Sequence, residues 1–170
     1  MSYSLNDPRS NGYDERSVLD SLWALIQEAA MKELSSTLKQ FCENAELLRL
    51  AYTDSKGYPR VVPVWFVILD EDYFIGTGST SAKWNALKRD SHVGWVIDGG
   101  EKGKYKGASM IGRAEEVTDQ EMRARIHRAL GEKYFGSADD EKFIEIYGQP
   151  DDAETVYLRL KAEDGISWEY

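Results

Sequence analysis

Apolar residues recur at helical spacing in the first part of the chain. From Ser17, which can cap a helix, the apolar stripe follows the three- and four-residue repeat of an amphipathic helix. A second helix is predicted to begin near Ser35 or Ser36 and to bury Leu38, Phe41 and Cys42. Residues 1–16 carry no such stripe, so we expect a flexible arm there and a single domain over residues 17–170.

After Asn44 the apolar period shortens towards two, which predicts β-strands. A meander of three strands is expected over residues 48–52, 60–69 and 73–77, with tight turns at Asp54–Gly57 and Asp70–Asp72. A short helix over 81–88 comes next. Two more strands are predicted over 92–98 and 107–117, separated by a flexible glycine-rich loop over 99–103.

Helical spacing returns near residue 118. Thr118 and Glu121 form a capping box for a helix that Gly136 would end, and a shorter helix is expected over 139–147. A strand over 154–160 and a strand piece over 166–168 complete the chain. Five or six strands in hairpin succession, interrupted by helices, predict a mainly β, α+β fold built on an antiparallel barrel.

Composition narrows the class of protein. The 170 residues are 42% hydrophobic and 30% charged, which is typical of one globular domain. No apolar stretch reaches the roughly 20 residues that cross a bilayer, and the first residues lack the pattern of a signal peptide, so we expect a cytoplasmic protein. The net charge of −9 disfavours nucleic acid and anionic membranes as partners and favours a small molecule or a protein.

Cysteine and histidine are scarce. A single cysteine, Cys42, excludes an intrachain disulfide, and its place in a helical pattern is typical of a buried structural thiol. His92 and His127 lie far apart in the sequence and, with one cysteine, make a poor set of metal ligands. We therefore expect no metal site.

One group of polar residues suggests an anion site. The strand that begins at Arg60 and the strand that ends at Thr77 are expected to be antiparallel neighbours, which puts both residues at one end of the sheet, beside Ser81 and Lys83 at the start of the short helix. Two cations and two hydroxyls would suit a phosphate. The residues alone leave another interpretation open, in which Ser81 only caps its helix and the two cations are only solvated.

These segments also resemble a known family. Gly57–Phe66, Thr77 and Ser81–Asp90 look like the flavin-binding split barrels related to pyridoxamine 5′-phosphate oxidase, and Gly112–Glu115 is similar to that family's central strand. The resemblance covers roughly residues 34–168. It implies a split antiparallel β-barrel and a homodimer that binds FMN at the subunit interface.

The resemblance also implies roles for individual residues. Arg60 and Lys83 would bind the FMN phosphate, and Ser81 and Thr77 would donate hydrogen bonds to it. Val61 and Val62 would lie along the flavin with their backbone groups facing the ring edge. Trp65 stands where oxidases of the family place a basic flavin contact, and Trp65 or Trp84 would line a face of the flavin.

The function implied is hydride transfer through bound FMN to oxygen or another small acceptor. The Ile166–Tyr170 end lacks the basic terminus of true pyridoxamine phosphate oxidases, which argues against vitamin B6 synthesis. Three alternatives stay open: an F420-dependent reductase, suggested by Pro63–Phe66; a non-catalytic flavin-binding or sensing protein; and a haem-handling relative, which the two histidines support weakly. No catalytic side chain is predicted, because the cofactor would supply the redox chemistry.

Overall fold

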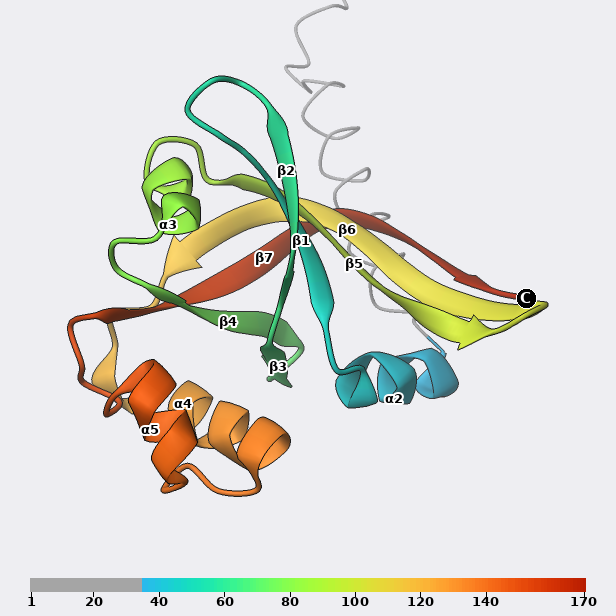
Figure 1. The fold of residues 1–170 in the computed structure, drawn as a ribbon. Coiled ribbons are helices and arrows are strands. Elements are labelled where there is room, and N and C mark those ends of the chain that lie inside the picture. The colour runs from blue at the N-terminus through green and yellow to red at the C-terminus, as the bar shows by residue number, and fades with distance from the viewer. Residues whose placement is uncertain (1–34) are drawn as a thin grey trace, which may run out of the picture. The chain divides into compact units, whose positions relative to one another are not determined.

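The computed structural model describes residues 35–170, and the predicted arm and the helix expected from Ser17 lie outside this range. Among the described residues, none of the helices has the length and apolar character needed to cross a membrane. The elements, shown in Figure 1, are α2 (Ser36–Asn44), β1 (Leu48–Thr53), β2 (Pro59–Val64), β3 (Phe66–Leu69), β4 (Asp72–Gly78), α3 (Ala82–Leu87), β5 (His92–Glu101), β6 (Lys104–Glu116), α4 (Gln120–Phe135), α5 (Glu141–Tyr147) and β7 (Thr155–Glu169).

The strands form one antiparallel sheet in the order β2-β1-β5-β6-β7-β4-β3. Helices are present as well, so the predicted α+β class is confirmed. The sheet curls without closing, and β2 and β3 lie at its two opposite ends although they are neighbours in the sequence. The chain thus passes from one end of the sheet to the other at a single residue, Trp65.

This break corrects the predicted meander. The single strand expected over 60–69 is two strands, and β2 pairs with β1 whereas β3 pairs with β4. The strand that begins near Arg60 is therefore not a neighbour of the strand that carries Thr77. Thr77 pairs with Val156 on β7 instead. Alternation of apolar residues could not reveal the break, because residues 61–69 form one continuous apolar run.

The glycine-rich stretch at 99–103 is also different from the prediction. It forms the end of a long hairpin in which β5 continues to Glu101 and β6 begins at Lys104, with Gly100 and Gly103 at positive φ. The two strand pieces expected over 154–160 and 166–168 are one strand, β7, which pairs with β6 along its length. Backbone pairing with β6, and not side-chain burial, keeps these polar segments of β5 and β7 extended.

Helix ends follow the predicted capping chemistry with one exception. Ser35 caps α2, Ser81 caps α3, and Gly136 ends α4 in the left-handed conformation. The N-cap of α4 is Asp119, whose carboxylate accepts the N–H of Met122, so the Thr118 capping box is wrong by one residue.

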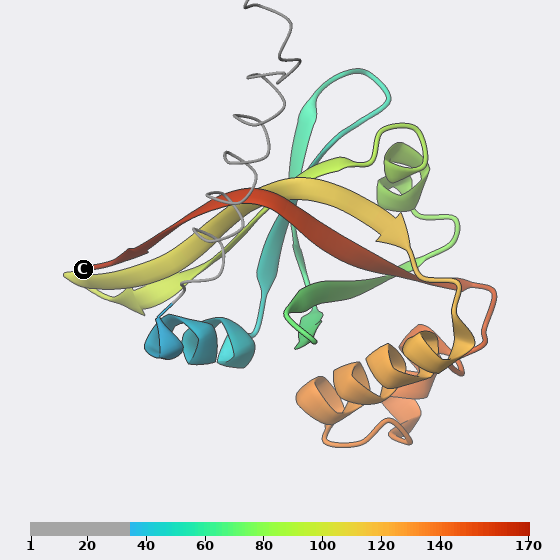
Figure 2. The same ribbon diagram turned by 180° about the vertical axis from the view of Figure 1, so that it is seen from behind.

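Two apolar clusters lie on opposite sides of the sheet. The inner side, which faces the barrel, packs Leu50, Ile75 and Trp95 with residues of α2 and α3. The outer side packs Phe74 and Tyr157 with α4 and α5. Gly76 lies under Tyr147, and a Cβ there would overlap the tyrosine ring. Figures 1 and 2 show α4 and α5 together at the β4 end and α2 beneath the long hairpin.

The other half of the outer side has no helix over it in the described chain. Here β2, β1, β5, β6 and the C-terminal half of β7 present apolar side chains, and Val61, Ile111 and Ile166 are 65%, 58% and 71% exposed. Val61, Ala51, Gly94 and Ile111 stand directly opposite one another across four strands. We call this surface the open face; its apolar members are Ala51, Val61, Pro63, Gly94, Val96, Ile111 and Ile166.

Candidate functional site

The candidate site begins where β4 ends and α3 starts. Thr77 is buried and, like Ile75 two residues earlier, points to the inner side of the sheet. Its hydroxyl lies 2.9 Å from that of Ser81, and the Ser81 oxygen accepts the backbone N–H of Trp84 at 3.1 Å. The two hydroxyls predicted to bind a phosphate therefore do lie together.

Lys83 follows in the first turn of α3 as a half-buried cation. Burial lowers the pKa of its ammonium group, and no neighbouring charge or hydrogen bond within residues 35–170 offsets that effect. A partly desolvated ammonium group without an acceptor is unfavourable. The arrangement would be relieved by an anion.

Arg60 is held differently. In β2 it stands opposite Tyr52, on the inner side of the sheet, which is also the side of α3. Its guanidinium binds Asp54 through Nε and Nη2, each 2.8 Å from the carboxylate. The backbone N–H groups of Tyr58 and Lys56 also donate to Asp54 and, with Arg60, lower the pKa of its carboxyl group. Sequence reasoning missed this acidic partner, which fixes Arg60 on the β1–β2 turn.

Helix α3 connects the two parts of the site. It packs against both β1 and β4, and Arg89 just beyond it donates to the carbonyl of Thr53 at 3.2 Å. The predicted proximity of Arg60 and Thr77 depended on their strands being neighbours in the sheet. The two strands are not neighbours. The β1–β2 turn and the end of β4 lie on either side of this helix, at one end of the barrel.

Val61 and Val62 lie on an edge strand. Among the described residues β2 pairs with β1 alone, so its other edge has unpaired backbone groups. Val61 points to the open face, and Val62 points inward and packs against the inner cluster. An exposed strand edge needs a partner or a cover. The predicted contact of this backbone with a flavin ring is compatible with that geometry and stays a prediction.

The two candidate tryptophans lie on opposite sides of the sheet. Trp84 packs against the inner cluster, with Lys88 5.5 Å from its ring centre. Trp65 belongs to the outer cluster and stacks on Tyr134 at 5.1 Å, with Phe135 5.4 Å away at its edge. The ring of Trp65 is thus engaged with α4. A flavin contact by either residue stays a prediction.

Comparison with known proteins identifies the family. A sequence profile of the family described as pyridoxamine 5′-phosphate oxidase matches residues 34–169. The chain belongs to the pyridoxamine 5′-phosphate oxidase family. A search of curated proteins found no match. Within residues 35–170 no group of metal-ligating side chains is present, and the candidate site of this family member is built from hydroxyls and cations.

Three solved structures share the fold of this chain at low sequence identity. The conserved hypothetical protein Rv2991 of Mycobacterium tuberculosis is 24% identical, with a TM-score of 0.69 over 81% of this chain and 86% of that one. The heme storage protein HutZ of Vibrio cholerae is 21% identical, with a TM-score of 0.63 over 81% and 94%. An FAD-binding protein of Mycobacterium smegmatis is 17% identical, with a TM-score of 0.58 over 81% and 98%. Identities this low show the shared fold alone.

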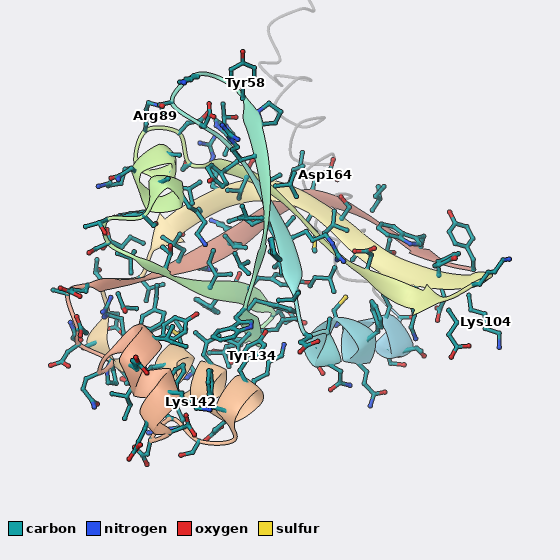
Figure 3. The ribbon with its side chains drawn as sticks, in the orientation of Figure 1. Tyr58, Arg89, Lys104, Tyr134, Lys142 and Asp164 are labelled. Atoms are coloured by element: carbon teal, nitrogen blue, oxygen red, sulfur yellow. The ribbon has the colours of Figure 1, made fainter. Side chains whose placement is uncertain are left out.

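The break in the sheet of this family member is fixed by side chains that sequence reasoning missed. The Tyr134 hydroxyl accepts the N–H of Phe66 at 2.9 Å and lies 2.9 Å from the carbonyl of Glu46, to which it can donate. Lys133 donates to the carbonyl of Phe66 at 3.1 Å, and burial lowers the pKa of its ammonium group to about 8. Figure 3 shows Tyr134 between α4 and the strands. Phe66 stands opposite Ile75 on β4, and the two side chains bind its backbone N–H and carbonyl groups.

Replacing Tyr134 by phenylalanine is expected to destabilise the fold by about 1–3 kcal/mol, because it leaves the N–H of Phe66 without an acceptor. Urea unfolding followed by tryptophan fluorescence measures the change. Tyr105→Phe is the matched control, since Tyr105 is half exposed. Equal stability of the two variants would contradict the role given to Tyr134.

A buried polar network anchors α4 to β7. His127 is 3% exposed, and its Nδ1 lies 2.8 Å from the Tyr157 hydroxyl. Arg123 donates to the carbonyls of Pro150, Asp152 and Thr155 at 3.0–3.1 Å. Burial, and then the charge of Arg123, lower the pKa of His127, while Asp139 acts weakly in the opposite direction. The neutral imidazole is the form that suits the folded state.

This network predicts a loss of stability in acid. Above the ordinary histidine pKa of about 6.5, His127 is neutral in both states. As the pH falls through that value, the unfolded chain takes up the proton first, so the free energy of unfolding decreases until the folded histidine also becomes charged. Thermal unfolding between about pH 8 and 5 should show a smaller pH dependence in His127→Asn. His92→Asn, which changes an exposed histidine, is the control; an equal reduction there would contradict the assignment.

Proposed function

We propose that this protein is a homodimeric, FMN-dependent oxidoreductase whose cofactor phosphate is held by Lys83, Ser81 and Thr77, with Arg60 at the side. The observation that carries the proposal is the half-buried ammonium group of Lys83, which has no anionic partner in residues 35–170 and belongs to the first turn of the helix that Ser81 caps, beside Thr77. Membership of the pyridoxamine 5′-phosphate oxidase family supports the same conclusion.

The chain's own residues would bind and orient the cofactor. When bound, the flavin supplies the capacity to accept and pass on a hydride. Lys83 and the two hydroxyls would fix the phosphate, and Asp54 keeps the guanidinium of Arg60 at the edge of the site. The free edge of β2 offers backbone donors and acceptors to the flavin ring. No side chain of the site needs to act as an acid or base.

The second copy of the chain would cover the open face. Val61 is exposed there and belongs to the same strand whose edge would contact the flavin, so one partner could cover both. The rim carries both signs of charge, with Arg49 paired to Asp98 and Arg113 paired to Glu163. An apolar centre with a mixed rim suits a two-fold contact in which each subunit uses the same surface.

The purified protein tests the cofactor directly. We expect a yellow protein that releases FMN on denaturation, detected by absorbance and mass spectrometry. Colourless protein would be titrated separately with FMN, FAD, F420 and haem, with fluorescence or absorbance as the readout. Tightest binding of FMN supports the proposal. Tighter binding of F420 would assign the reductase alternative, and binding of haem alone would overturn the flavin assignment.

Turnover separates an enzyme from a binding protein. The flavin-loaded protein is mixed anaerobically with NADH or NADPH, and bleaching at the flavin absorbance maximum is followed before and after oxygen is admitted. We expect bleaching and then recovery of the yellow colour. Bound flavin that neither nicotinamide reduces would favour the sensing alternative over an oxidoreductase.

A further inference from the structure

Three basic residues stand in a row on the outer side of the sheet, at the end of the open face nearest α3. His92 on β5 is directly opposite Arg113 on β6, and Arg113 is directly opposite Lys161 on β7. All three side chains are exposed. Directly opposite residues project to the same face, so the three groups are close neighbours. We call them the basic row.

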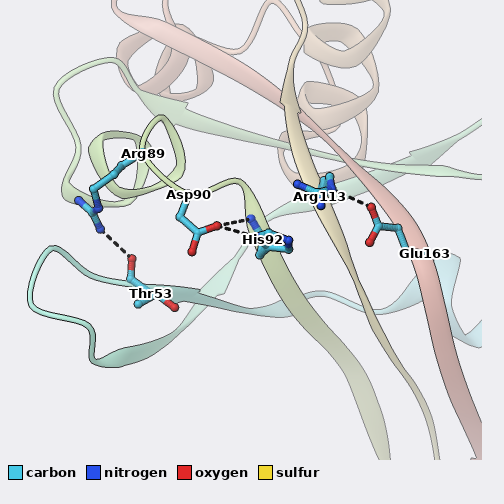
Figure 4. Close-up of polar contacts among 6 residues, drawn as sticks. All are labelled: Thr53, Arg89, Asp90, His92, Arg113 and Glu163. Carbon is cyan, nitrogen blue, oxygen red and sulfur yellow. Dashed lines mark hydrogen bonds and ion pairs between the residues drawn. The ribbon is translucent and has the colours of Figure 1, made fainter.

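His92 is held in one orientation. Its Nδ1 lies 2.7 Å from a carboxylate oxygen of Asp90, and its backbone N–H donates to the same oxygen at 3.1 Å. These bonds lower the pKa of the Asp90 carboxyl group. Figure 4 shows the carboxylate on one side of the ring, and Nε2 has no hydrogen-bond partner among residues 35–170. His92 is thus fixed on the surface with one ring nitrogen available.

Arg113 is fixed in a similar way. Its Nε donates to Glu163 at 2.9 Å, and Glu163 is the extra residue at the irregularity where β7 pairs with β6. The terminal amino groups of Arg113 stay available. Lys161 has no ion pair within the described residues. The row therefore combines the terminal amino groups of an oriented arginine, a free ammonium group and a fixed imidazole whose outward nitrogen can donate only when the ring is protonated.

Basic side chains are in the minority in a chain with a net charge of −9, and here three of them share one face of the sheet. Asp90 and Glu163 each hold one of the three, and the ammonium group of Lys161 has no ion pair within the described residues. We propose that the basic row is a second anion-binding site that holds the phosphate or carboxylate group of a small ligand. Within one subunit the row is separate from Lys83, because Lys83 belongs to α3 on the inner side of the sheet and the row lies on the outer side.

The histidine count of the chain makes the test direct. Only His92 and His127 occur in the sequence, so imidazole resonances in the NMR spectrum of the full chain can be assigned with one variant. The protein is titrated with inorganic phosphate, with pyrophosphate and with citrate, at constant ionic strength. We expect a saturable shift of the His92 resonances and none for buried His127. The most potent probe distinguishes phosphate from carboxylate ligands.

Variants decide whether the row forms the site. Arg113→Gln and Lys161→Gln should each weaken binding about tenfold or more, since each removes a charged donor. Lys142→Gln, an exposed lysine on α5 labelled in Figure 3, should leave binding unchanged. An unsaturable His92 shift, or equal shifts in all variants, would overturn the proposal. The titration is run with and without added FMN, so a failure of the flavin assignment is seen separately.

Discussion

Replacing Lys83 by alanine is expected to weaken FMN binding by about 10- to 100-fold. A hydrogen bond to a charged group contributes about 1.5–3 kcal/mol, and each 1.4 kcal/mol is a factor of ten. Burial already lowers the pKa of the Lys83 ammonium group in the protein alone, so its removal should not destabilise the cofactor-free fold. Fluorescence titration with FMN measures the affinity, and thermal unfolding without FMN measures the stability.

Two further lysine variants make this result specific. Lys88→Ala removes a cation at the other end of the same helix, where it lies over the ring of Trp84, and should leave FMN affinity close to that of the unchanged protein. Lys83→Arg keeps the charge and should recover most of the binding. If Lys83→Ala binds FMN as tightly as Lys88→Ala does, the phosphate is bound elsewhere and the site described above is wrong.

Local signals in the sequence were sufficient for most elements and for part of the candidate site. Helix α3 begins at Ala82 after Ser81, as the serine before an apolar pattern predicted, and the same serine meets Thr77. These features depend on residues a few positions apart. Capping and alternation are local properties, so a single sequence is enough to find them.

Contacts between residues far apart in the sequence could not be predicted from local patterns in this way. The break at Trp65 depends on Tyr134 and Lys133, which satisfy the backbone of Phe66 from 68 and 67 positions away in the sequence. No local pattern marks the point at which the pairing partner of the chain changes from β1 to β4. For this reason the prediction that Arg60 and Thr77 are adjacent failed. Asp54, which pairs with Arg60, had the sequence pattern of a turn residue only.

The basic row illustrates the same limit. His92, Arg113 and Lys161 are separated by 20 residues or more, and each taken singly is an ordinary surface residue. Register alone places them side by side. The bulge between Ile111 and Gly112 sets which β7 residue faces Arg113, and alternation of side chains gave no sign of it. Sites made of opposite residues on adjacent strands require the pairing to be known.

Replacing Ile111 by glutamate is expected to convert the proposed homodimer into a monomer. Ile111 lies in the open face and is 58% exposed, so the single subunit loses little packing when it is changed. In a two-fold contact each subunit would bring one new carboxylate into an apolar interface, where charge burial is costly. Size-exclusion chromatography with light scattering measures the mass across a range of protein concentrations.

Ile146→Glu is a closely matched control. Ile146 is 55% exposed and lies on α5, away from the open face, so the same substitution there should leave the mass unchanged. The flavin adds a second readout, because a cofactor held between subunits should be lost together with the dimer. A monomeric Ile111→Glu protein that retains FMN would place the whole flavin site within one subunit. An Ile111→Glu protein that stays dimeric would show that the open face is not the subunit interface.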